Sequence, residues 1–297
     1  MAIVSMLVPD FALILLGFLL FRQTRWGIDF WTGLEKLVYF ALFPALLFYA
    51  TSRTPLEFDR SGRLLETALL ATIAGVGLGW LAKALFSPGP MIFESAVQTA
   101  FRFNSYIGLA LASRLGGDAG TSLMALIIGF AVPFCNMAAV HALAHGRGGL
   151  GMALLKNPLL VATVAGMLCN VAGVHVPEVV NATLSRLANA SIALGLITVG
   201  AGLRLTNLPR ANGIAAYFIT VKLLVLPGIA FMIGRLLGLP PLHLQLAVLF
   251  CALPTASSAY VLAARMGGDG PFVAYVVSAG TLLSVLTLPL WLLLVSP

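Results

Sequence analysis

Long apolar runs follow one another along almost the whole chain, separated only by short polar connections. A helix needs about 20 apolar residues to cross the ~30 Å hydrocarbon core of a bilayer. Runs of about this length predict ten transmembrane helices, at 5–22, 33–51, 64–86, 91–114, 120–144, 154–173, 184–204, 212–236, 241–265 and 272–296. The longest connections, 52–63 and 174–183, are too short to fold alone. A binding site is therefore expected inside the membrane.

The composition supports this interpretation. Of the 297 residues, 60% are hydrophobic and 9% are charged, whereas about a quarter of the residues in a soluble domain carry charge. The predicted fold class is all-α integral membrane. The first run lacks a basic leader and is followed by further spans, so we expect it to be retained as a span and not cleaved as a signal peptide.

The net charge of +7 does not indicate a nucleic-acid partner, because the basic residues are scattered one or two per loop and form no stripe. Membrane topology explains their placement better, since cytoplasmic loops carry an excess of lysine and arginine. With both termini outside, nine basic residues lie on the predicted inner side: Arg22, Arg25, Lys36, Lys83, Arg147, Lys156, Arg204, Arg210 and Arg265. Six lie on the outer side: Arg53, Arg60, Arg63, Arg114, Arg186 and Arg235. This bias favours the orientation with both termini outside.

The second half of the chain repeats the first. Residues 111–118 and 262–269, which are 151 positions apart, share six identities in eight, including an arginine, two glycines and an aspartate. The predicted units are a first five-helix repeat at 1–144, a link at 145–153 and a second repeat at 154–297. Because five is odd, the second unit enters the membrane from the opposite side. Inverted repeats of this kind place a substrate site near the membrane midplane in transporters.

Two equivalent spans, 91–114 and 241–265, are predicted to be broken halfway and to cross at the breaks. A proline in a helix interior removes a hydrogen-bond donor, and the polar residues that follow are weak helix formers. The residues of the second break are Pro254, Thr255, Ala256, Ser257 and Ser258, and those of the first are Phe103, Asn104, Ser105 and Tyr106. Freed amides and positive helix ends at such a crossing would bind an anion. The alternative is a pair of ordinary kinks packed for shape.

Ionisable and polar residues inside the spans extend this hypothesis. Arg102 is predicted to bind an anionic group, because a guanidinium at that depth is costly unless it faces a cavity or a carboxylate. The alternative is a structural partner for a helix end or a buried acid. Glu94 and Gln98 precede it at steps of four, and Glu94 is a candidate coupling acid or a side chain that reaches the interface. Lys222 is a candidate for coupling or for capping a carbonyl, and Asn136 for lining the cavity.

Enzymatic chemistry is not indicated. The four histidines have no metal-ligand spacing with acidic or cysteine residues. No phosphate-binding loop of the Gly-x-x-x-x-Gly-Lys-Ser/Thr type occurs. We therefore predict that the chain is not an enzyme and that it uses no metal or cofactor.

The sequence resembles the auxin efflux carrier family, the bacterial relatives of the plant PIN carriers. The likeness runs over the whole chain, and it is carried by the ten spans in two inverted units, by FRFNSYIG at 101–108, by KLLVLP at 222–227 and by Pro254. The resemblance implies a crossed-helix fold of the PIN and bile acid symporter type, in a bacterial inner membrane. It also implies a scaffold domain, 5–51 with 154–204, which often dimerises through helices 1, 2, 6 and 7. The transport domain would be 64–144 with 212–296, and its movement would be elevator-like.

The family likeness, together with Arg102, predicts a secondary transporter of the efflux carrier type for small organic anions. Related bacterial members are linked to carboxylates such as malonate and malate, whereas the short central link and Asn104 argue against auxin itself. The alternatives are a sodium-coupled organic anion symporter similar to the bile acid carriers, or a membrane receptor that does not transport. Proton or sodium coupling is left open.

Overall fold

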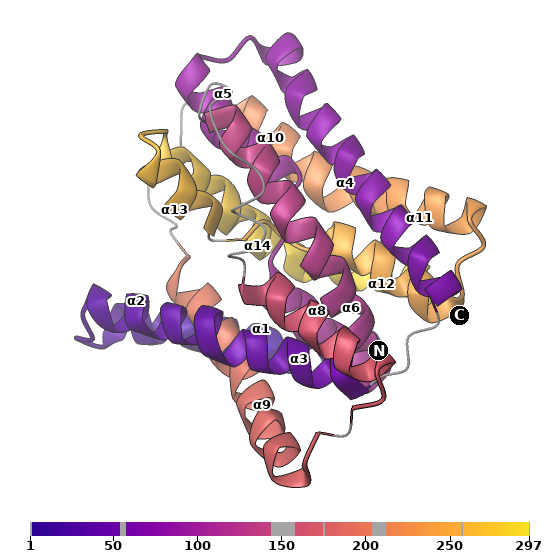
Figure 1. Cartoon of the computed structure of the whole chain (residues 1–297). Coiled ribbons are helices and arrows are strands. Elements are labelled where there is room, and N and C mark those ends of the chain that lie inside the picture. Colours follow the sequence, from indigo (N-terminus) through magenta and orange to yellow (C-terminus); the bar gives the residue numbers. More distant parts are fainter. Residues whose placement is uncertain are drawn as a thin grey trace. The chain divides into compact units, whose positions relative to one another are not determined.

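The structure is a computed structural model that describes residues 2–53, 58–143, 158–174, 176–203, 212–256 and 258–296. Every regular element in these residues is helical, and they contain no strand (Figure 1). The prediction of an all-helical fold is confirmed for the described residues. Contacts divide the chain into two compact units, and each is described by itself.

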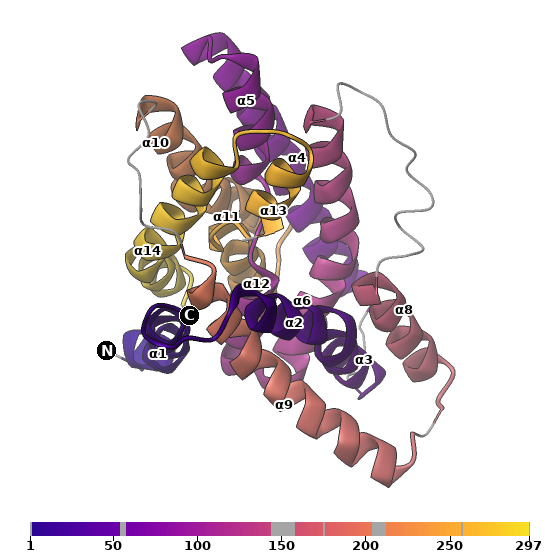
Figure 2. The same cartoon turned by 90° about the vertical axis from the view of Figure 1, so that its left-hand side faces the viewer.

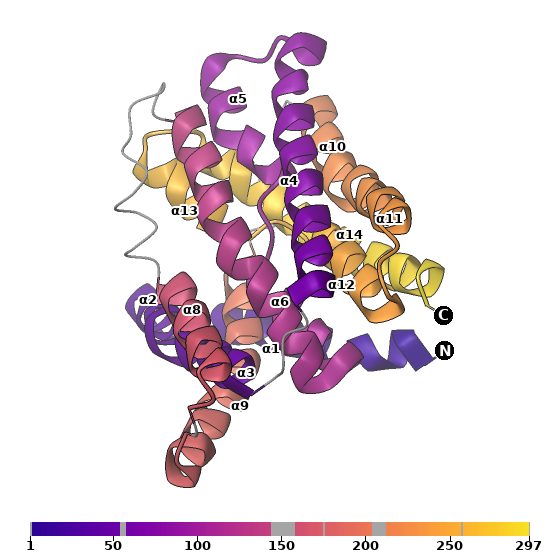
Figure 3. The same ribbon diagram turned by 45° about the vertical axis from the view of Figure 1, so that its right-hand side comes forward.

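The first unit comprises Met1–Phe58, Tyr106–Phe130 and Gly151–Gly202. Its helices are α1 (Ala2–Gln23), α2 (Ile28–Leu37), η1 (Val38–Leu42), α3 (Phe43–Arg53), α8 (Pro158–Val171), α9 (Glu178–Ala201) and the first part of α6 (Ser105–Leu143). α9 packs against both α1 and α3, and α8 packs along α3 (Figure 3). α1 and α9 approach very closely, because a Cβ atom at Gly17 or Gly200 would overlap a carbonyl oxygen of the facing helix. Small residues allow such contact between membrane helices.

The second unit comprises Asp59–Ser105, Ala131–Leu150 and Leu203–Pro297. Its helices are α4 (Phe58–Phe86), α5 (Pro90–Ala96), η2 (Val97–Ala100), α10 (Asn212–Thr220), η3 (Val221–Val225), α11 (Leu226–Leu236), α12 (Pro241–Ala252), α13 (Ser258–Arg265), α14 (Gly270–Leu294) and the last part of α6. α14 contacts α12 and α13 (Figure 2), and α11 packs against α12. The predicted scaffold domain, transport domain and repeat boundaries stay predictions.

Six helical segments among the described residues are long and apolar enough to cross a membrane. They are Ile28–Arg53, Ser61–Phe86, Pro90–Leu143, Glu178–Ala201, Gly213–Leu236 and Gly270–Leu294. The third has 54 residues, more than twice the ~20 that one crossing needs, and it covers two of the predicted spans. The count of ten spans stays a prediction.

The repeated sequence forms a chain reversal or kink in both places. In α6, Gly116 and Gly117 leave helical geometry, and Gly117 has a φ of +56°, which side chains with a Cβ rarely adopt. At the equivalent place α13 ends, Gly267 has a φ of +77°, and α14 begins. Asp269 caps α14 by accepting a hydrogen bond of 2.9 Å from the Phe272 amide. The glycine pairs therefore separate the helices that the sequence placed on either side of them.

Candidate functional site

Two helix interruptions in the second unit meet through their backbones. Helical structure stops after η2 and resumes with α6 at Ser105, and it stops again after α12 and resumes with α13 at Ser258. The Asn104 amide donates a hydrogen bond of 2.8 Å to the Pro254 carbonyl. Asn104 is 2% exposed, so the bond is sheltered from solvent. Both interruptions lie where the sequence predicted them, and this bond fixes one against the other.

The carbonyl groups released by the first interruption are paired by side chains. The Thr255 hydroxyl donates a hydrogen bond of 2.7 Å to the Thr99 carbonyl. The Cys135 thiol lies 3.6 Å from the Phe101 carbonyl oxygen, to which it donates. Unpaired backbone groups are costly where water is absent, so non-helical backbone at membrane depth needs partners of this kind. Thr255 therefore stabilises the first interruption from within the second.

Arg102 lies in the first interruption and contacts both broken segments. Its Nη1 donates to Gln98 Oε1 at 3.1 Å, and its Nη2 donates to Ser258 Oγ at 3.0 Å. Gln98 is fully buried and its amide donates to the carbonyl oxygens of Ser95 and Ala259. The guanidinium is half-buried and these two bonds are to neutral oxygen atoms. The second interruption thus holds a cation at the start of α13, where the positive end of the helix dipole also lies.

Lys222 contacts the end of α12, just before the second interruption, whereas Arg102 contacts the start of α13, just after it. Its side chain is 3% exposed, and Nζ donates a hydrogen bond of 2.7 Å to the carbonyl of Cys251 in the last turn of α12. The π-helical segment η3 carries it, and single π turns inside α-helices are frequent at functional sites. Of the two roles that the sequence left open, the structure shows the capping contact. A coupling role for Lys222 stays a prediction.

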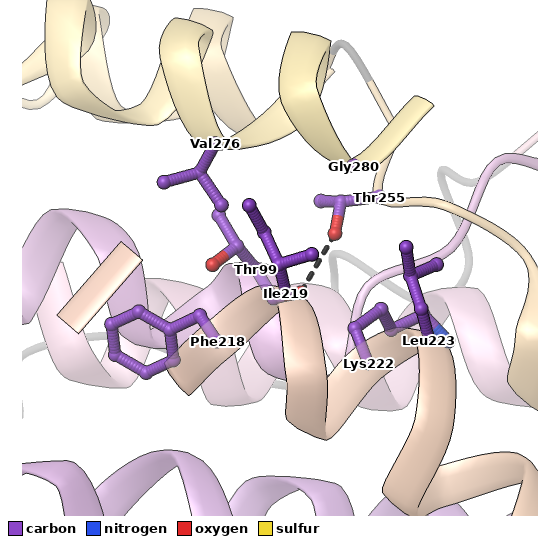
Figure 4. A pocket seen from close by; sticks show the side chains of 8 residues that line it. All are labelled: Thr99, Phe218, Ile219, Lys222, Leu223, Thr255, Val276 and Gly280. Atoms are coloured by element: carbon purple, nitrogen blue, oxygen red, sulfur yellow. Dashed lines mark hydrogen bonds between the residues drawn. The ribbon is translucent and has the colours of Figure 1, made fainter. Parts of the chain in front are cut away.

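A small cavity separates the α10–η3 helix from α14 near these groups (Figure 4). Its volume is about 10 Å³, close to the space that one water molecule needs. The polar lining residues are Thr99, Thr255 and Lys222, and the apolar ones are Phe218, Ile219, Leu223, Val276 and Gly280. The cavity therefore joins the hydroxyl groups of the two interruptions to the buried lysine.

Two predicted aromatic site residues are used for packing. The Phe103 ring is 5% exposed and stacks edge-on against Phe250, with ring centroids 4.5 Å apart. Tyr106 belongs to the first unit, where its ring lies 4.2 Å from that of Phe43 and against Gly195. Direct contact with a ligand stays a prediction for both residues.

The remaining predicted residues surround the interruptions in different ways. Ser105 begins α6, and Ala256 accepts a hydrogen bond of 3.0 Å from the Ala259 amide. Asn136 is half-buried on α6, next to Cys135. Glu94 is half-buried in α5, one turn before Gln98. Ser257 lies outside the described residues.

Sequence reasoning missed Thr99 and the thiol of Cys135. Thr99 supplies the carbonyl that Thr255 caps and also lines the cavity. The only signal for Thr99 was its place three residues before Arg102. No signal in the sequence indicated Cys135, because its partner, the Phe101 carbonyl, is a backbone group that no side-chain pattern reveals.

Comparisons with known proteins find similarity to membrane transport proteins. Residues 147–292 match the family described as "Membrane transport protein". A protein of Rhizobium meliloti (strain 1021) named "Putative malonate transporter" is 27% identical, and the alignment covers 96% of this chain and 93% of that protein. "Uncharacterized transporter YfdV" of Escherichia coli (strain K12) is 25% identical, with 96% and 95% covered. An "Uncharacterized transporter" of Methanothermobacter thermautotrophicus is also 25% identical, with 94% of each chain covered.

The family match covers the second interruption, Lys222 and the cavity-lining part of α14, and the alignments with the transporters extend over nearly the whole chain. The described helices include several that are long and apolar enough to span a bilayer. These findings identify an integral membrane protein and a transporter, and they exclude an enzyme as the interpretation. The second half of the chain thus matches the membrane transport protein family, and nearly the whole chain is similar to proteins named as transporters, in agreement with the resemblance to the auxin efflux carrier family.

Proposed function

We propose that this transporter carries small organic anions, with carboxylates of the size of malonate as the substrate class. The observation that carries the proposal is the position of Arg102, which contacts both interrupted segments through Gln98 and Ser258. A guanidinium offers two parallel donors that match a carboxylate, and it stays charged at any physiological pH. The name of the relative from Rhizobium meliloti, which mentions malonate, supports the same class.

In this proposal the substrate carboxylate binds Arg102, the hydroxyl of Ser258 orients it, and the bond between the Asn104 amide and the Pro254 carbonyl holds the two segments together. The described cavity has room for about one water molecule and is not lined by Arg102, so in this proposal a dicarboxylate reaches Arg102 only when the surrounding helices separate. Such separation is what alternating access requires of a site near the membrane midplane. Lys222 and Glu94 are the proposed residues that link binding to movement.

The finer architecture belongs to the same proposal. We infer ten spans in two inverted five-helix repeats, an elevator-like movement of one group of helices, and a location in a bacterial inner membrane. The repeated Arg-x-Gly-Gly-Asp sequence supports the duplication, because both copies lie at a kink or turn between helices. A homodimer through helices 1, 2, 6 and 7 is the proposed assembly.

The test is uptake of labelled malonate, malate and indole acetate into proteoliposomes, with and without a sodium or proton gradient. We expect saturable flux of a short carboxylate, and we expect Arg102→Ala to reduce it at least tenfold. Arg102→Lys should retain part of the flux, because it keeps the charge and loses the paired donors. The matched control is Arg235→Ala, which removes an exposed arginine from the end of α11.

The outcomes separate the alternatives. Saturable flux that Arg102→Ala leaves unchanged would keep the carrier but reject this anion site. Flux that requires sodium would identify the sodium-coupled symporter. Binding of a carboxylate by well-folded protein without any flux would identify the receptor.

A further inference from the structure

The end of α12 creates a patch of negative potential inside the second unit. The helix stops at Ala252, and the next residue leaves helical geometry with a ψ of 138°. Pro254 has no amide hydrogen, and residues 254–256 do not continue the helix. The last carbonyl groups of a helix carry about half an elementary negative charge in total. Buried as they are, these carbonyl groups need a donor or a cation.

The side chain of Lys222 supplies a donor to one of these carbonyl groups. The Lys222 ammonium donates to the Cys251 carbonyl oxygen at 2.7 Å, and both residues are almost completely buried. Its helix is anchored nearby, since the Trp291 indole donates a hydrogen bond of 2.9 Å to the Leu223 carbonyl. The helix that carries Lys222 is thus fixed within the unit, and the ammonium lies at the end of α12.

The polar groups that share this cavity with the lysine carry oxygen atoms of the kind that bind small cations, whereas the other lining residues are apolar. Thr255 and Thr99 line the same cavity as Lys222, and the Cys251 carbonyl lies beside it. In transporters with interrupted helices, freed carbonyls and the C-terminal ends of half-helices coordinate sodium or protons. A mobile sodium ion and the fixed ammonium would compete for the same negative helix end.

We propose that Lys222 acts as a tethered cation that takes the place of a coupling ion at the end of α12. The carrier therefore needs no sodium for transport. This inference rests on the proposed function and deepens it, because it assigns the control of ion coupling to one residue. Lys222 is a positioning residue here: it stabilises the helix end and does not touch the substrate.

The first measurement is carboxylate flux in sodium chloride and in choline chloride of equal concentration. We expect wild-type flux to agree within about twofold between the two media. Lys222→Ala should lose at least tenfold in choline chloride and regain much of its flux when sodium or ethylammonium is added, since either cation can enter the space left by the side chain. Lys83→Ala is the control, because Lys83 is an exposed lysine of α4 in the same unit.

The second measurement needs no transport. Ethylammonium chloride should raise the melting temperature of Lys222→Ala by at least about 3 °C relative to choline chloride, because a ligand that binds the folded state stabilises it. Wild type and Lys83→Ala should not respond. If wild type moves no carboxylate, the proposed function fails, and this measurement still decides the role of Lys222.

Three results would overturn the inference. They are a sodium requirement of wild-type flux, full flux of Lys222→Ala in choline chloride, and a Lys222→Ala protein whose flux and melting temperature respond to neither sodium nor ethylammonium. Lys222→Met repeats the test with a side chain of similar length and no charge, so that the loss of packing volume is separated from the loss of the cation.

Discussion

The Arg114 guanidinium binds the Asp10 carboxylate through two hydrogen bonds, Nε to Oδ2 at 2.6 Å and Nη2 to Oδ1 at 3.0 Å. The pair joins α6 to α1 inside the first unit. The Asp10 side chain is only 5% exposed, whereas that of Arg114 is 35% exposed. The first copy of the repeated arginine therefore serves to hold two helices of one unit together.

Replacing Arg114 with leucine should destabilise the protein because it removes this partner from a buried carboxylate. Breaking a fully buried ion pair costs about 3–5 kcal/mol, and the partial exposure of Arg114 reduces our expectation to about 2 kcal/mol. Thermal unfolding in detergent measures the effect. The double variant Asp10→Asn with Arg114→Leu should be less destabilised than the sum of the single variants. Additive losses would show that the two side chains do not interact.

Adding a methyl group at Gly200 should separate α1 from α9. A Cβ atom there would overlap the Ile14 carbonyl oxygen, and the facing backbone cannot move aside as a flexible side chain would. Overpacking of this kind costs about 1–3 kcal/mol, so Gly200→Ala should unfold at a lower temperature. Gly33→Ala is the control, because a Cβ atom at Gly33 would meet nothing within 4 Å. Equal melting temperatures for the two variants would contradict the close approach.

Thr255→Val should weaken the join between the two interruptions. The substitution nearly preserves shape but removes the hydroxyl that donates to the Thr99 carbonyl. Leaving a buried carbonyl unpaired costs about 1–3 kcal/mol. We expect a lower melting temperature and a lower maximal flux, whereas Thr255→Ser, which keeps the hydroxyl, should recover most of both. Failure of serine to recover more than valine would assign the effect to packing.

Ser258→Asp should compete with the proposed substrate. The new carboxylate would lie at the start of α13, where negative charge is favourable, and within reach of Arg102, which already donates to the serine hydroxyl. Because the guanidinium would then be neutralised from within the protein, we expect KM for a carboxylate to rise at least tenfold. Ser258→Asn has a similar size without the charge and should change KM much less. Equal KM values for the two variants would show that Arg102 does not bind the substrate's charge.

Local signals predicted the places where the helices stop. Pro254 cannot continue a hydrogen-bond ladder, and the paired glycines at 116 and 117 allow a backbone that other residues avoid. These effects act over a few residues, so the sequence reveals them directly. The run at 103–106 also predicted an interruption, because it lies at the position in the first repeat that corresponds to Pro254 in the second.

Contacts between distant residues were beyond such signals. Lys222 meets a backbone carbonyl 29 positions away, and Asp10 meets Arg114 across 104 positions. Which acceptor a long side chain reaches depends on how its helix is rotated and packed, and η3 changes that rotation locally. The sequence identified Lys222 as a candidate site residue, but only the folded unit shows that its partner is the Cys251 carbonyl.

The bond between the Asn104 amide and the Pro254 carbonyl involves main-chain atoms only. It persists whatever side chain stands at either position, with proline at 104 as the exception, because proline has no amide hydrogen to donate. Side chains around the two interruptions can therefore be exchanged without removing the bond that joins the two segments. In a carrier built this way, a substitution that changes which substrate binds need not break the bond that holds the two segments together.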